Sequence, residues 1–194
     1  MEDKILREHN YILECMSVKL RPMKDEDFNI MLKWYGDLEV LYYSEGNDVQ
    51  EPYSTVDEIK GVYKTAPNAF CFIIEYENKP IGECWLQKNN HQYLTDEYPD
   101  ADIRRIDIVI GEKEYWGKGI GTICVRLLTQ FGFEIEKADM IFFISMDYNV
   151  RSCKTAERVG YKLLSKTEVE DNPKTKFELN YGMTKEDYFS MNTH

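Results

Sequence analysis

The sequence predicts an α/β domain, and three observations support this. Residues 106–110 form a strand-like run, followed by a glycine-rich turn and then by a segment whose apolar residues recur with the i, i+3, i+4, i+7 spacing of a half-buried helix. Residues 69–76 and 81–87 are apolar runs separated by Glu77-Asn78-Lys79-Pro80, a hairpin turn signal. Two helical patterns also lie between the first strand-like run and the second.

The other elements follow in chain order. Residues 18–22 alternate like a short strand ended by proline. Asp25 or Asp27 stands near the start of a first helix with one apolar face, and Ser54 or Thr55 can cap a second helix. Residues 89–104 are predicted as a long functional loop. The remaining predictions are strands over 105–111, 140–144, 161–166 and 176–181, helices over 120–134 and 149–159, and a short helix after Thr184.

Length and composition indicate one domain over residues 17–194, preceded by an extension over residues 1–16 that the patterns do not place. The N-terminus is too charged for a secretory signal, and no run approaches the roughly 20 apolar residues of a membrane span. Five scattered cysteines are typical of reduced thiols in a cytoplasmic protein. With three histidines and no close Cys/His pair, no metal site is expected.

The formal net charge of −11 argues against a nucleic-acid partner, which needs a basic face. An acidic protein attracts a cationic substrate, although the same charge is explained by solubility alone.

The turn over residues 115–122, Tyr-Trp-Gly-Lys-Gly-Ile-Gly-Thr, is the most informative segment. Three alternating glycines let main-chain N–H groups approach a ligand, and the first turn of the following helix leaves its donors unpaired. Such a turn can hold a phosphate or pyrophosphate, or it can be a tight connection without a ligand. The glycine order fits neither the Walker motif nor the dinucleotide fingerprint.

Residues 116–121 resemble the pyrophosphate loop of the GNAT acetyltransferases, Q/R-x-x-G-x-G/A, with Trp116 in place of the usual Gln or Arg. This resemblance implies the GNAT fold, a mixed and mostly antiparallel central sheet flanked by helices, and acetyl-CoA as cofactor. The likeness to the aminoglycoside 6′-N-acetyltransferases is carried in register by residues 18–23, 31–34, 72–82, 98–99, 106–112 and 115–122, and it covers about residues 17–165. The implied cofactor-binding residues are Ile108, Val109, Ile110, Trp116, Gly117, Lys118, Gly119, Ile120, Gly121, Thr122, Asn149 and Ser152.

In that family the aspartate at the place of Asp107 is the candidate general base. A charge inside Ile106-Asp107-Ile108 is costly unless it faces a cleft or a partner. The alternative is an ion pair with Arg104 or Arg105, of which strand alternation puts Arg105 on the same face. In that case Asp107 binds and orients the ammonium as well as taking its proton.

Two departures from the family lie in the C-terminal half. Ile144 stands where the family commonly has an aspartate. Ala156 stands where the family has the tyrosine that protonates the leaving thiolate. Asn149 and Ser152 instead resemble the Asn-x-x-Ser of N-terminal acetyltransferases. Ser152 either donates to the departing thiolate or stabilises the start of its helix. Asp147 can partly replace the missing acid.

The sequence thus predicts an acetyl-CoA-dependent N-acetyltransferase acting on a primary amine of a cationic small molecule, by aminoglycoside 6′-N-acetylation, with no membrane partner and as a monomer or homodimer. The main-chain N–H of Val109 is the expected donor to the thioester carbonyl. Protein N-terminal acetylation, polyamine acetylation and a non-catalytic acyl-CoA sensor remain alternatives. The candidates for the acceptor side are Trp34, Tyr35, Glu83, Glu97, Tyr98, Asp100, Asp107 and Asp147. Any one of the first six can instead be only a surface or core residue.

Overall fold

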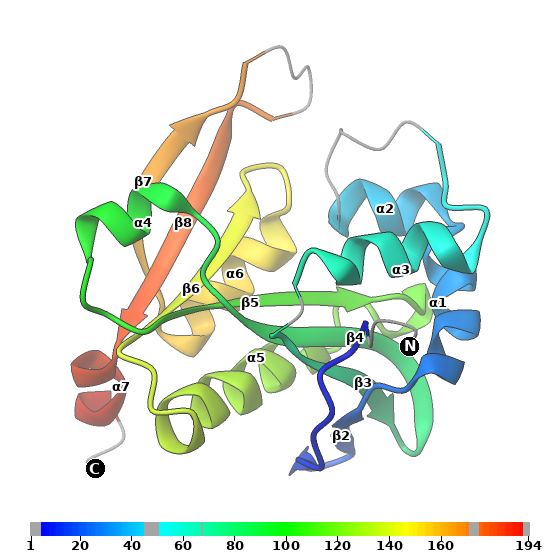
Figure 1. Cartoon of the computed structure of the whole chain (residues 1–194). Helices are drawn as coiled ribbons and strands as arrows, with labels where there is room; N and C mark the ends of the chain where they lie inside the picture. The colour runs from blue at the N-terminus through cyan, green and yellow to red at the C-terminus, as the bar shows by residue number, and fades with distance from the viewer. Residues whose placement is uncertain (1–4, 45–50, 67, 171–174, 192–194) are drawn as a thin grey trace. The chain divides into compact units, whose positions relative to one another are not determined.

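The computed structural model describes residues 5–44, 51–66, 68–170 and 175–191. They divide into two compact units, 1–85 with 108–124 and 86–107 with 125–194, so that strands β4 and β5 and helix α5 each pass from one unit into the other (Figure 1). The eight strands are hydrogen-bonded in the order β1-β2-β3-β4-β5-β6-β8-β7. The β5–β6 pair is parallel, whereas β1–β2, β2–β3, β6–β8 and β7–β8 are antiparallel, which confirms the mixed α/β sheet expected from the sequence.

The first unit packs three helices around one apolar cluster. Tyr63 lies at its centre, with its ring edge-on to Phe28 at 5.3 Å and to Trp85 at 4.7 Å between centroids. Thr55 begins α3 with a capping box, in which its side chain accepts from the Glu58 N–H and the Glu58 carboxylate accepts in return. Figure 1 shows α1, α2 and α3 side by side. The elements are β1 Leu13–Cys15, β2 Val18–Pro22, α1 Phe28–Tyr35, α2 Leu38–Ser44, α3 Val56–Lys64, β3 Phe70–Tyr76 and β4 Lys79–Lys88.

Residues 5–16 of the N-terminal extension belong to this unit. Ile5 and Leu6 pack against its apolar cluster. The Arg7 guanidinium lies 3.6 Å from the centroid of the Phe70 ring, and His9 Nε2 donates to the Cys71 carbonyl at 3.0 Å. Strand β1, which pairs with β2, completes the attachment.

The second unit is built on β6 and β8, with the edge strand β7 exposed along its whole length. Helix α4 covers one face through Leu94, which packs with Ile103, Met140 and Phe142. Helix α6 begins at Asn149, whose side chain accepts from the Ser152 N–H, and ends at Gly160 in a left-handed conformation. The remaining elements of the chain, of which β5 and α5 belong partly to the first unit, are α4 Gln92–Glu97, β5 Ile103–Ile110, α5 Ile120–Gln130, β6 Met140–Met146, α6 Val150–Val159, β7 Lys162–Glu168, β8 Phe177–Thr184 and α7 Lys185–Met191.

The structure adds three elements to those predicted. Helix α4 occupies part of the segment predicted as a loop, helix α2 lies between the two predicted helices, and β1 lies in the extension. All three elements are too short to show a full apolar period in the sequence. In α2, for example, only Val40 and Leu41 are buried. Helix α5 ends at Gln130, and a π-helical turn over Phe131–Ile135 replaces the last part of the helix predicted to reach residue 134.

Candidate active site

The glycine turn precedes α5 in the conformation that a close main-chain approach requires. Gly117 and Gly119 have φ angles of 74° and 81°, in the left-handed region that favours glycine. A Cβ built on either glycine would have no atom within 4 Å, so that the space beside both is open. The Gly119 carbonyl accepts from the Ile123 N–H, which places the N–H groups of Ile120 to Thr122 in the first helical turn. The turn and helix start therefore fit a pyrophosphate.

Trp116 has a structural part in this turn. Its indole Nε1 donates to the carbonyl of Ile110 at 2.7 Å, and its ring lies edge-on to Tyr43 at 5.5 Å between centroids. These contacts tie the turn to the end of β5. The departure from Gln or Arg at this position thus leaves the glycine conformations in place.

Asp107 lies on β5 with its two carboxylate oxygens in different surroundings. Its Oδ2 accepts from Gln87 Nε2 and from Arg105 Nε, each at 2.9 Å. Its Oδ1 has no hydrogen-bond partner in the part of the chain that the structure describes. The Asp107 side chain is 36% exposed, against 16% for Arg105. The ion pair with Arg105, left open by the sequence, is therefore present, and the carboxylate is held by one oxygen while the other remains accessible.

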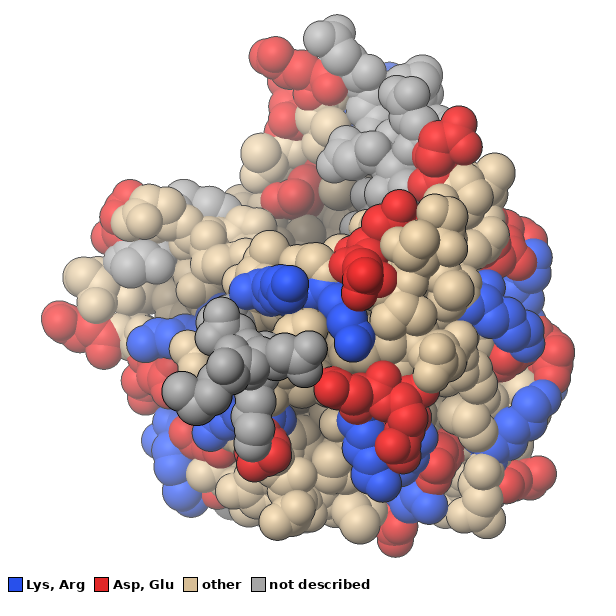
Figure 2. All heavy atoms as spheres, turned by 45° about the vertical axis from the view of Figure 1, so that its right-hand side comes forward, with Lys and Arg blue, Asp and Glu red and all other residues tan. Residues whose placement is uncertain are grey.

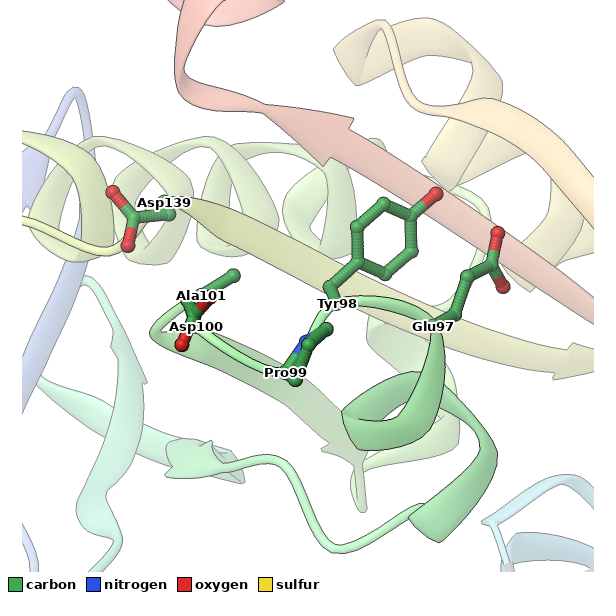
Figure 3. A pocket seen from close by; sticks show the side chains of 6 residues that line it. All are labelled: Glu97, Tyr98, Pro99, Asp100, Ala101 and Asp139. Carbon is green, nitrogen blue, oxygen red and sulfur yellow. The ribbon is translucent and has the colours of Figure 1, made fainter.

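Three expected acceptor residues gather around one hollow of the second unit, of about 450 Å³, at the end of α4. Glu97, Tyr98 and Asp100 line it together with Pro99, Ala101 and Asp139. In Figure 3, Glu97 and Tyr98 lie together on one side and Asp100 and Asp139 on the other. The Glu97 carboxylate beside the Tyr98 hydroxyl raises the pKa of that phenol above its usual value. Residues with carboxylate side chains thus lie on two sides of the hollow.

Glu83 and Tyr35 lie inside the first unit. Tyr35 donates its hydroxyl to Glu83 Oε1 at 2.7 Å, and the two residues are 6% and 3% exposed. Burial raises the pKa of the neighbouring Tyr63 phenol well above its usual range, and the Glu83 carboxylate adds to the rise. Both residues lie within the core of their unit, a position that differs from the open acceptor side expected from the sequence.

Trp34 has a similar place. Its ring covers Gly111, where any Cβ would overlap it, and its Nε1 donates to Glu112 Oε1 at 3.0 Å. Burial works to raise the pKa of Glu112, but hydrogen bonds from Lys33 and Trp34 outweigh it and lower that pKa below its usual value. In the described packing Trp34 supports the segment that follows β5.

Asp147 and Asn149 lie at the turn between β6 and α6. Asp147 Oδ1 accepts from the Thr175 hydroxyl, which lowers the pKa of the Asp147 carboxyl, and Oδ2 accepts from the Lys176 N–H at 3.3 Å. Asn149 Oδ1 accepts from the main-chain N–H of Ser152 at 3.2 Å, so that Asn149 forms the helix cap. The structure thus gives Asn149 the capping role and involves Ser152 through its main chain. The parts of Asn149 and Ser152 in binding the cofactor stay predictions.

Sequence reasoning missed Gln87, Asn90 and His91 as members of the Asp107 environment. Arg105 Nη1 contacts Asn90 Oδ1 and His91 Nε2, each at 2.9 Å. The available signal was a run of polar residues, Gln87 to His91, at the end of an apolar strand.

Among the described residues no group of three or more His, Cys, Asp and Glu side chains is arranged to hold a metal ion. No helix within the described ranges has the length and apolar character needed to cross a membrane.

Comparison with known proteins agrees with this fold and with the glycine turn. Residues 17–162 match the family model of the acetyltransferase (GNAT) domain, which covers most of the chain. The chain therefore belongs to the GNAT acetyltransferases, which use acetyl-CoA as cosubstrate.

Two curated relatives have different acceptors in their names. Spermidine N(1)-acetyltransferase of Escherichia coli K12 is 23% identical over 150 residues, which cover 76% of this chain and 74% of the relative. Aminoglycoside N(6′)-acetyltransferase type 1 of Klebsiella pneumoniae is 24% identical over 166 residues, covering 81% and 80%.

Two solved structures are also an aminoglycoside acetyltransferase and a spermidine acetyltransferase. The complex of AAC(6′)-Ib with ribostamycin and coenzyme A superposes with a TM-score of 0.75 at 18% identity, over 92% of this chain and 99% of the other. Spermidine N-acetyltransferase of Vibrio cholerae, in complex with coenzyme A and spermine, has a TM-score of 0.71 at 19% identity, over 89% and 98%. At these identities the likeness establishes the fold.

Proposed function

We propose that this acetyltransferase transfers an acetyl group to a primary amine of a cationic small molecule, the 6′-amine of an aminoglycoside. The observation that carries the proposal is the Asp107 carboxylate, which is fixed through Oδ2 and open at Oδ1. A primary amine is mostly protonated near neutral pH, and only its free base is a nucleophile. A fixed carboxylate can hold the ammonium and then accept the proton that the attacking nitrogen loses.

The acidic hollow supports a polycationic acceptor. Helix α4 is six residues long, so that about 9 Å separates its start, next to His91 and the Asp107 environment, from its end at Glu97. An acceptor with several amines can place one amine at Oδ1 of Asp107 and a second near the carboxylates of Glu97 and Asp100. Figure 2 shows acidic and basic side chains lying next to one another over the viewed face, so the net charge of −11 is not one uniform field there. Local carboxylates are therefore the better basis for acceptor recognition.

The chain's residues divide the remaining work. The main-chain N–H groups of the glycine turn and of the first turn of α5 would hold the pyrophosphate of coenzyme A. The main-chain N–H of Val109 would donate to the carbonyl on which negative charge develops. Bound acetyl-CoA supplies the activated acetyl thioester. In the transfer the amine nitrogen would bond to the acetyl carbon, the C–S bond would break and coenzyme A would leave as its thiolate, while the proton lost by the amine would go to Asp107. Holding both reactants in place supplies much of the acceleration.

Polyamine acetylation is the second candidate. The E. coli spermidine acetyltransferase matches this chain at 23% identity, almost the same as the 24% of the aminoglycoside relative. A linear polyamine, like an aminoglycoside, carries several cationic amines.

A thiol-release assay with acetyl-CoA distinguishes the candidates. Kanamycin, spermidine and a short peptide with a free N-terminus are offered in turn, and the products are identified by mass spectrometry and NMR. We expect kanamycin to have the highest kcat/KM and to be acetylated at its 6′-amine. Raising salt should increase the KM of the amine more than that of acetyl-CoA, because exposed charges are screened beyond ~10 Å at about 0.1 M salt.

Each other outcome selects an alternative. Preference for spermidine assigns the polyamine function, and preference for the peptide assigns N-terminal acetylation. Acetyl-CoA binding without turnover of any amine identifies an acyl-CoA sensor. Equal salt sensitivity of the two KM values contradicts a polycationic acceptor.

A further inference from the structure

A chain of side chains in the second unit leads from Asp107 to a histidine. Arg105 Nε donates to Asp107 Oδ2, while Nη1 of the same guanidinium contacts Asn90 Oδ1 and His91 Nε2, all at 2.9 Å. The Arg105 side chain is only 16% exposed, so that its planar fork is enclosed between the two ends of this chain. Gln87 adds a second donor to the same Asp107 oxygen at 2.9 Å.

Arginine has donors only, which fixes the state of His91. In a contact with Arg105 Nη1, the Nε2 of His91 must be the acceptor, so the ring is neutral and its proton is on Nδ1. The charged groups that face the ring are Arg105, Asp107 and Glu178. Burial is the main cause that lowers the pKa of His91 below 6.5, and the Arg105 charge adds to it, while Glu178 and Asp107 act in the opposite direction.

We propose that Arg105 is a positioning residue for acetyl transfer, held by neutral His91 and by Asn90 so that it fixes Oδ2 of Asp107 and directs Oδ1 toward the acceptor amine. This proposal rests on the proposed function of Asp107 as the group that receives the amine proton. In this proposal the role of Arg105 depends on the planar, forked geometry of its guanidinium and not on its positive charge alone.

The second arginine of β5 provides a matched control. Arg104 is 14% exposed and is also paired, with Nε donating to Asp102 Oδ1 at 2.8 Å and with Glu136 3.6 Å from its Nη1. It is the next residue of the same strand, and alternation points its side chain to the other face. Arg104→Ala therefore removes an equally buried and equally paired guanidinium that does not touch Asp107.

The experiment compares Arg105→Ala, Arg105→Lys and Arg104→Ala with the wild type, using its best amine. Arg105→Ala should lower kcat roughly 100-fold, the order expected for a misplaced reacting group, while acetyl-CoA binding by calorimetry stays unchanged. Arg104→Ala should stay within a few-fold of the wild type. Arg105→Lys should remain impaired because an ammonium cannot form the fork, and added guanidinium should partly restore Arg105→Ala.

Several results overturn the proposal. Full activity of Arg105→Lys would mean that the positive charge alone is sufficient. A loss of kcat in Arg104→Ala equal to that in Arg105→Ala, or no recovery of Arg105→Ala activity with added guanidinium, would also contradict it. Circular dichroism and acetyl-CoA binding show whether Arg105→Ala folds. If it does not, the activity of Arg105→Lys and the pH profile described below test the proposal. A wild-type protein without turnover of any amine contradicts the proposed function itself, which separates the two failures.

The pH profile of kcat/KM tests the His91 end of the chain. Protonated His91 cannot accept from Arg105 and repels it, so activity should fall as pH decreases through the lowered pKa of His91, below 6.5. His91→Gln offers a side-chain oxygen as acceptor at every pH. Whatever its activity near pH 7.5, this variant should lose this part of the acidic fall and keep the fall that amine protonation causes. Identical profiles for the two proteins overturn the role of His91.

Discussion

Asp107 and Glu83 are both carboxylates within strands, and their surroundings are opposite. The Asp107 side chain, in the second unit, is 36% exposed, and its two donors both reach Oδ2. Glu83, in the first unit, is 3% exposed and is reached by a tyrosine hydroxyl in an aromatic core. The first arrangement leaves an oxygen for a ligand, whereas the second directs the carboxylate into the interior.

The difference shows how burial divides similar residues between chemistry and stability. An accessible carboxylate that is held on one side can bind a cation without reorganising its surroundings. A buried carboxylate is costly unless hydrogen bonds satisfy it, and removing its partner leaves a polar group unsatisfied. We therefore expect changes at Asp107 to act on kcat/KM and changes at Glu83 to act on the free energy of unfolding.

The largest effect is expected for Asp107→Asn, which keeps the shape and removes the charge. The value of kcat/KM for the acceptor should fall by roughly 10²–10⁴, the usual contribution of a general base. Binding of acetyl-CoA should change little. Steady-state kinetics and calorimetry measure the two quantities. If the folded variant turns over its best amine at nearly the wild-type rate, Asp107 is structural and the comparison with Glu83 fails.

The second effect concerns Glu83. In Glu83→Leu the Tyr35 hydroxyl loses this acceptor, and the free energy of unfolding should fall by about 1–3 kcal/mol. Glu83→Gln keeps an acceptor oxygen and should lose less. For the folded protein, kcat/KM should change far less than in Asp107→Asn. Urea denaturation with activity measured on the same samples tests this, and a large loss of kcat/KM at unchanged stability in Glu83→Gln would assign Glu83 to the reaction.

The surroundings of these two carboxylates also show which features could be predicted from the sequence and which could not. The strand–turn–helix around residues 106–120 was confirmed, because periodicity and glycine placement are local signals. Alternation along β5 placed Arg105 beside Asp107, and the structure confirms their contact. Gln87 and His91 were missed because they lie 20 and 14 residues from their partners, and strand register and loop path determine those contacts.

Burial was harder to predict from sequence. Glu83 lies in an apolar strand like Asp107, but Tyr35 of α1 and Tyr63 of α3 lie beside it. Trp34 is buried because Gly111, 77 residues away, leaves room for its ring. Helix α4 carries no full apolar period, yet its buried residue Leu94 packs with Ile103 of β5 and with Met140 and Phe142 of β6. Such contacts between distant segments are absent from any local pattern.

The smallest effects should come from removing one donor to each carboxylate. Tyr35→Phe removes the hydroxyl that donates to Glu83 and should cost about 1 kcal/mol of stability with little change in kcat/KM. Gln87→Met removes one of the two donors to Asp107 Oδ2, a bond of about 1 kcal/mol, so kcat/KM should fall roughly fivefold while Arg105 still holds the carboxylate. Unfolding curves and kinetics measured side by side should therefore show opposite patterns in the two variants. Loss of stability in both, with kcat/KM unchanged, would mean that the donors of Asp107 hold the fold as those of Glu83 do.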